Sequence, residues 1–244
     1  MADPTAFREV TVAASPGRRS DTAAPVHLLA NSPVTGETRT IMERCAANLV
    51  AYQGDRTAAR YVATVDAAWE RERALTNRTD FSSAVAANLH KFLAYKDEYE
   101  VARMLTDPAF VDSLQTEVPG GAKLTYMLHP PTMKALGRTK KIGFGPRSHG
   151  VLKLLAKGKV LRGTPFDPFG YAHVRKVERH LVAHYEAMVV DLTDTLTLET
   201  FDTAVAAASA PDVVRGYEDV KLRNVATYVT RLSALGIDSA ALNI

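Results

Sequence analysis

The sequence predicts a mainly α-helical protein with a minor β element near residues 123–128. Apolar residues recur every three or four positions along most of the chain from Thr40 onward, which is the period of a helix with one buried face. Residues that start or stop helices flank these runs. Strict alternation occurs only in a short stretch, and 46% hydrophobic with 23% charged residues among 244 is typical of a globular protein.

The first 38 residues differ from this body. Prolines and glycines alternate there with short polar runs, and no period is sustained. We interpret residues 1–38 as a poorly ordered leader or the remnant of a preceding domain, because chain ends without an apolar face usually stay unfolded. Residues 39–244 then form one helical domain.

Two adjacent helices open the domain. Met42, Cys45 and Leu49 share one helical face, and a second run extends from Asp55 to Trp69. Both are expected to bury that face against the rest of the domain.

The longest predicted helix extends from Asp80 to Thr106. Its apolar stripe continues for about seven turns, and Asp80 is expected to accept hydrogen bonds from the amides of the first turn. Asp107 and Pro108 then restart the chain into a short helix over residues 109–118, with Asp as the cap and Pro at the first helical position.

The remaining elements follow turn signals. The alternation over 123–128 predicts a strand, whose partner the sequence does not locate, and two glycine–proline loops at 143–146 and 163–170 bracket a helix that contains residues 151–155. Further helices are predicted over 171–192, 201–209 and 217–235. Thr197 is expected to cap the second of these, and Gly236 to end the third.

Positive charge is concentrated in one window. Residues 118–166 contain no Asp or Glu but ten Lys and Arg, which leaves 20 basic and 27 acidic residues elsewhere, a balance of −7. The ten are Lys123, Lys134, Arg138, Lys140, Lys141, Arg147, Lys153, Lys157, Lys159 and Arg162. Three interpretations stay open: a solvated face, a contact for an anion or another domain, and nucleic-acid binding.

Nucleic-acid binding is the least favoured of the three, because few aromatic residues lie among the lysines and no recognised binding signature is present. For an anion or domain interface the candidates are Lys140, Lys141, Arg147, Lys153 and Arg162.

A second candidate surface is the loop after this window. Pro165, Phe166, Asp167, Phe169 and Tyr171 combine a restricted backbone with aromatic area, which suits docking against another domain. An ordinary rigid turn with its aromatics in the local core explains the same residues equally well. In either case Asp167 is expected to start the following helix rather than to act as a catalytic acid.

Other chemical patterns are weak. His180 and His184 lie four apart on a helix, but no third ligand is evident, so no metal site is assigned. Asp97, Glu98 and Glu100 are interpreted as solvated charges, and no catalytic residue is assigned. The single cysteine, Cys45, excludes an internal disulfide and a four-thiolate iron–sulfur cluster held by this chain alone.

The sequence contains no segment that would direct the protein into a membrane or out of the cell. No apolar run reaches the roughly 20 residues of a membrane-spanning helix, and the start lacks the apolar segment of a secretion signal. We therefore expect a cytoplasmic protein without a membrane role.

Three strings carry a family resemblance: residues 88–103 (NLHKFLAYKDEYEVAR), 162–171 (RGTPFDPFGY) and 215–221 (RGYEDVK). In this order they resemble the carboxy-terminal domain of the long, single-chain indolepyruvate:ferredoxin oxidoreductases. The likeness extends from about Met42 to about Leu235.

The resemblance implies a parent enzyme that oxidatively decarboxylates aryl 2-oxo acids to acyl-coenzyme A and passes the electrons to ferredoxin, using thiamine diphosphate, magnesium and [4Fe–4S] clusters. This chain lacks the diphosphate-binding and cluster-binding motifs, so no cofactor is expected on it alone and those domains are expected to be its partners. The isolated chain is then expected to be inactive, as a fragment or as an independent subunit. The alternative is an autonomous basic module for an anionic partner or nucleic acid. The sequence does not specify the 2-oxo acid or the oligomeric state.

Overall fold

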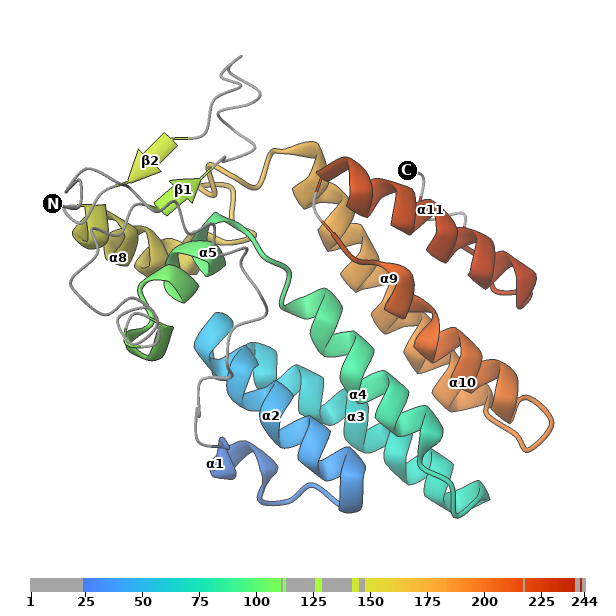
Figure 1. The fold of residues 1–244 in the computed structure, drawn as a ribbon. Helices are drawn as coiled ribbons and strands as arrows, with labels where there is room; N and C mark the ends of the chain where they lie inside the picture. The colour runs from blue at the N-terminus through green and yellow to red at the C-terminus, as the bar shows by residue number, and fades with distance from the viewer. Residues whose placement is uncertain are drawn as a thin grey trace, which may run out of the picture.

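The computed structural model describes residues 24–110, 112, 126–128, 142–144, 148–216, 218–239 and 242. Within these residues the chain is mainly α-helical, as predicted, and Figure 1 shows its long helices lying side by side. The helices are α1 (Val26–Leu29), α2 (Gly36–Tyr52), α3 (Asp55–Leu75), α4 (Asp80–Leu93), α5 (Glu98–Leu105), α8 (His149–Lys157), α9 (His173–Thr195), α10 (Phe201–Ser209) and α11 (Glu218–Ala234). Two 3-10 turns, η2 (Gly158–Leu161) and η3 (Ala210–Val213), and two strands, β1 (Tyr126–Leu128) and β2 (Ile142–Phe144), complete the described elements.

Most of these helices form one bundle, made of α1 to α4 and α9 to α11. Helix α4 lies in its middle and contacts α2, α3, α9 and α10. Phe92 packs edge-on against Tyr185 of α9 at 5.4 Å and against Tyr228 of α11 at 5.8 Å between ring centroids. Such edge-to-face pairs add to the stabilisation from burial, so this aromatic cluster joins three helices of the bundle.

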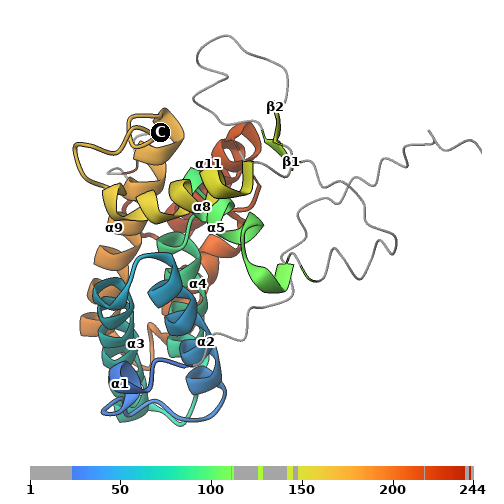
Figure 2. The same ribbon diagram turned by 90° about the vertical axis from the view of Figure 1, so that its left-hand side faces the viewer.

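A second region lies at one end of the bundle. We call α5, α8, η2 and the loop of residues 162–172 the α5–α8 unit. Helix α8 packs on α5, and Figure 2 shows α8 lying across the side of the molecule that faces the viewer, above α2 and α3. None of the described residues between 95 and 176 belongs to the apolar core cluster of the bundle. The unit is therefore held in place by other contacts.

The predicted single helix over 80–106 is wrong, because the structure divides it into α4 and α5. Ala94 has φ −97° and ψ 50°, which is not helical. Asp97 is extended, at φ −96° and ψ −175°, and its Oδ1 accepts a hydrogen bond from the Glu100 amide at 2.8 Å. Asp97 thus caps a new helix, and Asp with Glu three residues later is a capping pattern that the continuous apolar stripe concealed.

The predicted cap of α4 is also wrong. Asp80 is the first residue of α4 and makes no cap hydrogen bond, and the first-turn amides bind Glu72 of α3 instead. The Glu72 carboxylate is fully buried and accepts from the amides of Phe81 and Ser82, both at 2.9 Å, and from the Ser82 hydroxyl at 2.5 Å. A carboxylate at a helix N-terminus is stabilised by the free amides there, so Glu72 replaces a local cap with a contact between helices.

The minor β element is confirmed, and the structure supplies its partner. β1 pairs with β2 in antiparallel register, with Met127 opposite Gly143. The sequence predicts a loop at Gly143, because a glycine two residues from another glycine and near a proline usually marks a turn. A three-residue strand offers too little alternation to outweigh that signal.

The described part of the chain can be compared with the predicted boundaries at both of its ends. The described part begins at residue 24, and Leu29 and Val34 are buried in the core, so the body begins before the predicted boundary at 38. Residues 1–23 lie outside the described part. At the other end Gly236 has φ 74°, and the amides of Gly236 and Ile237 bond to the carbonyls of Ser233 and Leu232, which is the predicted glycine stop of α11.

None of the described helices combines the length and the apolar character that crossing a bilayer requires.

Candidate functional site

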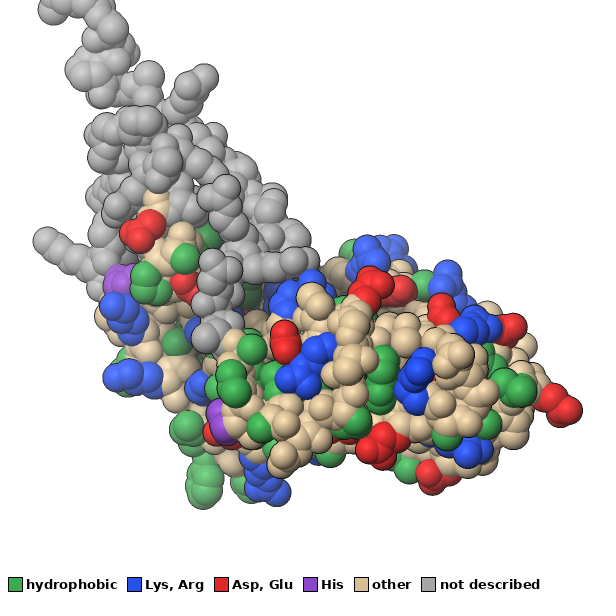
Figure 3. All heavy atoms as spheres, turned by 90° about the horizontal axis from the view of Figure 1, so that it is seen from below, with side chains coloured by type: hydrophobic (Ala, Val, Ile, Leu, Met, Phe, Trp, Pro, Cys, Tyr) green, Lys and Arg blue, Asp and Glu red, His purple; other side chains and the backbone are tan. Residues whose placement is uncertain are grey.

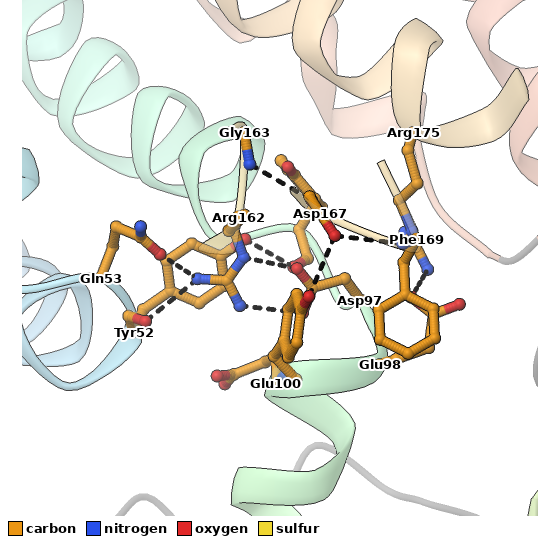
Figure 4. A network of polar contacts seen from close by, with 12 residues as sticks. Tyr52, Gln53, Asp97, Glu98, Glu100, Arg162, Gly163, Asp167, Phe169 and Arg175 are labelled. Atoms are coloured by element: carbon orange, nitrogen blue, oxygen red, sulfur yellow. Dashed lines mark hydrogen bonds and ion pairs between the residues drawn. The ribbon is translucent and has the colours of Figure 1, made fainter. Parts of the chain in front are cut away.

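The three strings that carry the family resemblance are connected where the α5–α8 unit joins the bundle, and Figure 4 shows the contacts between residues of the first two. Residues 88–103 form the end of α4 and the start of α5, residues 162–171 form the loop after η2, and residues 215–221 lead into α11. A network of buried ion pairs connects them, although 111 residues lie between the end of the first string and the start of the third along the chain.

Arg162 is the centre of this network. Its guanidinium donates two hydrogen bonds to the Asp97 carboxylate, Nε to Oδ2 at 2.5 Å and Nη2 to Oδ1 at 2.8 Å. It also donates to the Tyr52 carbonyl at 3.1 Å and to the Gln53 side chain, and its Cζ lies 3.7 Å from the centroid of the Tyr52 ring. One side chain thereby links the end of α2, the start of α5 and the loop after η2.

The Arg162–Asp97 pair is almost completely shielded from water. The side chains of Arg162 and Asp97 are only 6% and 3% exposed. A bidentate pair of this kind fixes relative orientation, because the planar guanidinium matches the carboxylate in one arrangement. Loss of either partner would leave a buried charge without compensation, which is strongly destabilising.

Asp167 organises the loop of residues 162–172. Its Oδ1 accepts from the Tyr99 hydroxyl at 3.0 Å and from the Phe169 amide at 3.1 Å, and its Oδ2 accepts from the Gly163 amide at 3.2 Å. The prediction that Asp167 starts the following helix is wrong, because α9 begins only at His173. The buried carboxylate instead ties the loop to α5 and to its own backbone.

A second chain of charges joins α5 to α9 and α11. Arg175 donates to Glu178 at 2.5 Å and to Glu98 at 3.3 Å, and Lys221 of α11 donates to the other oxygen of Glu178. Burial raises the pKa of the Glu98 carboxyl, and the nearby Arg175 opposes that rise. The Arg175–Glu98 contact attaches the start of α5 to α9, and the Lys221–Glu178 contact joins α9 to α11.

The acidic residues of α5 differ from the expectation of solvated charges. Asp97, Glu98 and Glu100 are 3%, 8% and 6% exposed, and all three have basic partners. Glu100 pairs with Arg103 through two hydrogen bonds, at 2.8 and 2.6 Å. The helical wheel alone does not show this burial, because the basic partners of Asp97 and Glu98 lie far away in the sequence.

The five cations proposed for an anion or domain interface have different outcomes. Lys140, Lys141 and Arg147 lie outside the described residues. Lys153 is exposed on α8, and Arg162 is buried and already paired with Asp97, so it is not free to meet an external anion. The basic-module alternative therefore stays a prediction. In the view from below, acidic and basic side chains are interspersed over the described surface (Figure 3).

The predicted docking loop divides into an inner and an outer half. Asp167 is buried, and Phe169 packs edge-on against Tyr99 with 5.2 Å between ring centroids. Phe166 and Tyr171 are 80% and 66% exposed, beside an exposed Pro165 whose carbonyl accepts from the Tyr171 hydroxyl at 2.6 Å. Two of these residues thus contribute to the local core, as the rigid-turn interpretation expects, and the others face solvent, where docking against another domain stays a prediction.

The histidines of α9 do not come together with further ligands in the described part. His180 is exposed, and Nε2 of His184 lies 3.1 Å from the Asp238 carbonyl. No group of three or more His, Cys, Asp or Glu suited to a metal ion occurs among the described residues. A hollow of about 340 Å³ lies on the outside of α8, lined by Thr106, Gly150, Lys153, Leu154, Ala156 and Lys157.

Several residues of the network were missed by sequence reasoning. Tyr52, Gln53, Arg175, Glu178 and Lys221 had no assigned role, although each contacts a residue of another element. Lys221 lies in one of the strings that carry the family resemblance, which was the only signal available for it. The other four occur as ordinary polar residues of helices and a turn.

The geometry of the network suits holding elements together. Its carboxylates bind guanidinium, ammonium, hydroxyl or amide groups of the same chain, and the hollow on α8 is lined by none of them. Acid–base chemistry needs a titrating group within hydrogen-bond reach of a substrate, and these groups are enclosed. The described part of the chain is thus a helical domain with a buried, self-paired charge network.

A protein-family model matches the same part of the chain that helices α2 to α11 occupy. The chain belongs to the family of unknown function DUF6537, whose profile matches residues 38–234, from the start of α2 to the end of α11. Neither the curated proteins nor the solved structures give a significant match.

Proposed function

We propose that this chain is the non-catalytic carboxy-terminal domain or subunit of an indolepyruvate:ferredoxin oxidoreductase-like enzyme of the cytoplasm. The observation that carries the proposal is the convergence of the three resembling strings in one buried network. The first two strings supply partners to each other, and Lys221 of the third is connected to them through Glu178 and Arg175, so all three behave as parts of one structural unit.

The chemistry of the network explains why such strings would be retained together. Arg162 needs Asp97, Tyr99 needs Asp167, and Glu178 needs Lys221. A buried charge without its partner costs several kcal/mol, roughly 3 to 5 in measured cases. A relative that places the α5–α8 unit on the bundle in the same way would therefore need the same strings, which supports a shared architecture with the oxidoreductase domain.

The proposed division of labour assigns cofactors to the partners. Thiamine diphosphate, magnesium and the [4Fe–4S] clusters would be bound by other domains or subunits, which would carry out decarboxylation and electron transfer to ferredoxin. The only cysteine, Cys45, lies buried in α2, away from any surface where a cluster would be held. This chain would hold those domains or subunits together in the assembled enzyme.

The proposal is tested by purifying the affinity-tagged chain from the cells that naturally produce it. We expect thiamine diphosphate and iron in the eluate, together with ferredoxin reduction that depends on an aryl 2-oxo acid and coenzyme A. Arg56→Ala, an exposed change on α3, serves as the control and should give the same eluate. A chain that elutes without thiamine diphosphate and iron would contradict the proposal.

A further inference from the structure

The α5–α8 unit exposes an unusual amount of apolar surface. Six of the ten exposed large hydrophobic side chains among the described residues lie between 151 and 171. They are Val151, Leu154, Val160, Leu161, Phe166 and Tyr171. Single exposed apolar residues are common on proteins, but a concentration of them marks a surface that contacts another molecule.

Helix α8 presents two stripes to solvent. Leu152 is 2% exposed and faces inward, where α8 packs on α5. Val151 and Leu154 are 62% and 72% exposed, and they are three residues apart, so they are neighbours on the outer surface. Lys153 and Lys157 are exposed and four residues apart, and form a basic stripe beside the apolar one.

The loop holds its exposed aromatic residue on a fixed backbone. Asp167 bonds the amides of Gly163 and Phe169, which lie on either side of Phe166. The Tyr171 hydroxyl closes the same loop on the Pro165 carbonyl. An exposed aromatic side chain on an ordered loop loses little freedom on binding, and such residues dominate the affinity of interfaces.

The charged residues of α8, η2 and the first half of the loop are all basic. No Asp or Glu occurs between residues 148 and 166. Lys159 and Arg162 point inward, to the Ala51 carbonyl and to Asp97, which leaves Lys153 and Lys157 to face outward. A partner that matches this side needs carboxylates near an apolar patch.

We propose that the outer side of the α5–α8 unit, formed by Val151, Leu154, Val160 and Phe166 with Lys153 and Lys157, docks an acidic and apolar surface on the thiamine- and cluster-binding part of the enzyme. This rests on the proposed function and names the surface through which it acts. A symmetric contact between two copies is disfavoured, because it would place the basic stripe of each copy against that of the other. Nucleic acid is disfavoured by the large aliphatic share of the surface.

The test measures the affinity of the full chain for the thiamine- and iron-containing polypeptide that co-purifies with it. Two variants change the surface: V151S/L154S/F166S removes apolar area, and K153E/K157E reverses the charge. The matched controls are V190S/L198S on α9 and the turn after it, and R56E/R223E on α3 and α11, which change exposed residues of the same kinds elsewhere.

We expect the apolar variant to weaken binding by about 100-fold, and the charge variant by about 10-fold or more, with both controls unchanged. Wild-type affinity should also fall as salt rises from about 0.1 M to about 0.5 M, and the charge variant should lose that dependence. Circular dichroism of each variant confirms that the helical fold is kept.

Other results overturn the inference in distinguishable ways. If the wild-type chain binds the partner and both surface variants bind equally well, the surface is wrong while the proposed function stands. If the wild-type chain binds no thiamine-containing partner, the proposed function fails and the inference fails with it. A wild-type dimer that V151S/L154S/F166S converts to a monomer would assign the surface to a second copy, and retention on DNA or RNA that K153E/K157E abolishes would assign it to nucleic acid.

Discussion

The bundle and the α5–α8 unit are held together by different kinds of contact. In the bundle, buried apolar and aromatic side chains from α2, α3, α4, α9, α10 and α11 form one continuous core. In the unit, Tyr99, Ala102 and Leu152 are the only buried hydrophobic residues. The attachment to the bundle depends on polar contacts instead, those of Arg162 with Tyr52 and Gln53 and that of Glu98 with Arg175.

The two kinds of contact have different consequences. Apolar burial is non-directional and tolerates repacking, so a bundle specifies its fold through many replaceable residues. A buried ion pair contributes little net stability but penalises every arrangement that separates its partners. We therefore expect the bundle to supply most of the stability, and the unit to depend on a few particular residues and to open more easily.

The largest effect should come from the bundle. Phe92→Ala removes the ring that packs on Tyr185 and Tyr228 at the centre of the aromatic cluster, and should lower the free energy of unfolding by about 4 kcal/mol. Trp69 is the only tryptophan and lies buried in α3, so its fluorescence in urea reports on the bundle. Leu198→Ala, at an exposed position, should leave the midpoint unchanged; an equal shift in both variants would contradict a localised core.

The next effect should be confined to the unit. Arg162→Ala leaves Asp97 buried without its cation, and should make opening of the α5–α8 unit easier by about 3 kcal/mol. Limited proteolysis should then cut α5 or α8, while the Trp69 transition stays in place.

Adding D97N to R162A separates charge from capping. Asn removes the unpaired charge but still accepts from the Glu100 amide, so it should restore part of the protease resistance. A Trp69 midpoint that moves as far as in F92A would show that the unit and the bundle unfold as one.

The third expected effect is a pH dependence of stability that arises in the bundle. Burial, and to a lesser degree the Arg44 charge, lower the pKa of His90 in α4 to about 4 from the ordinary 6.5. The unfolded chain then binds a proton that the folded chain does not, so stability is complete above about pH 6.5 and is lost as the pH falls toward 4. Between about pH 7 and pH 5 the loss should be about 2 kcal/mol, measured by Trp69 fluorescence in urea. His90→Gln should flatten this part of the curve, and an unchanged slope would assign it to other groups.

The smallest effects come from two glycines of the unit. A Cβ at Gly158 would lie 2.9 Å from Cε1 of Tyr99, whose hydroxyl is held by Asp167, so Gly158→Ala should destabilise the unit by about 1 kcal/mol. Gly150 in α8 has open space around that position, so Gly150→Ala should stabilise by about 0.5 kcal/mol. The rate of proteolysis within α8 measures both effects. It should rise in Gly158→Ala and fall in Gly150→Ala.

The sequence predicted the bundle better than the unit, for the same physical reason. The period of Met42, Cys45 and Leu49 identifies a helix without knowledge of its neighbours, because one face is apolar. The role of Asp97 depends on Arg162, 65 residues away, and no local pattern contains that information. Glu72 illustrates the same limit, since it caps α4 from another helix.

Native-state hydrogen exchange tests the central contrast most directly, because it measures the opening free energy of each helix in one sample. We expect the amides of α5 and α8 to exchange together, through an opening of lower free energy than that of α3, α4 and α9. Arg162→Ala should lower protection in α5 and α8 alone. A single opening free energy shared by all these helices, lowered uniformly by Arg162→Ala, would contradict that contrast.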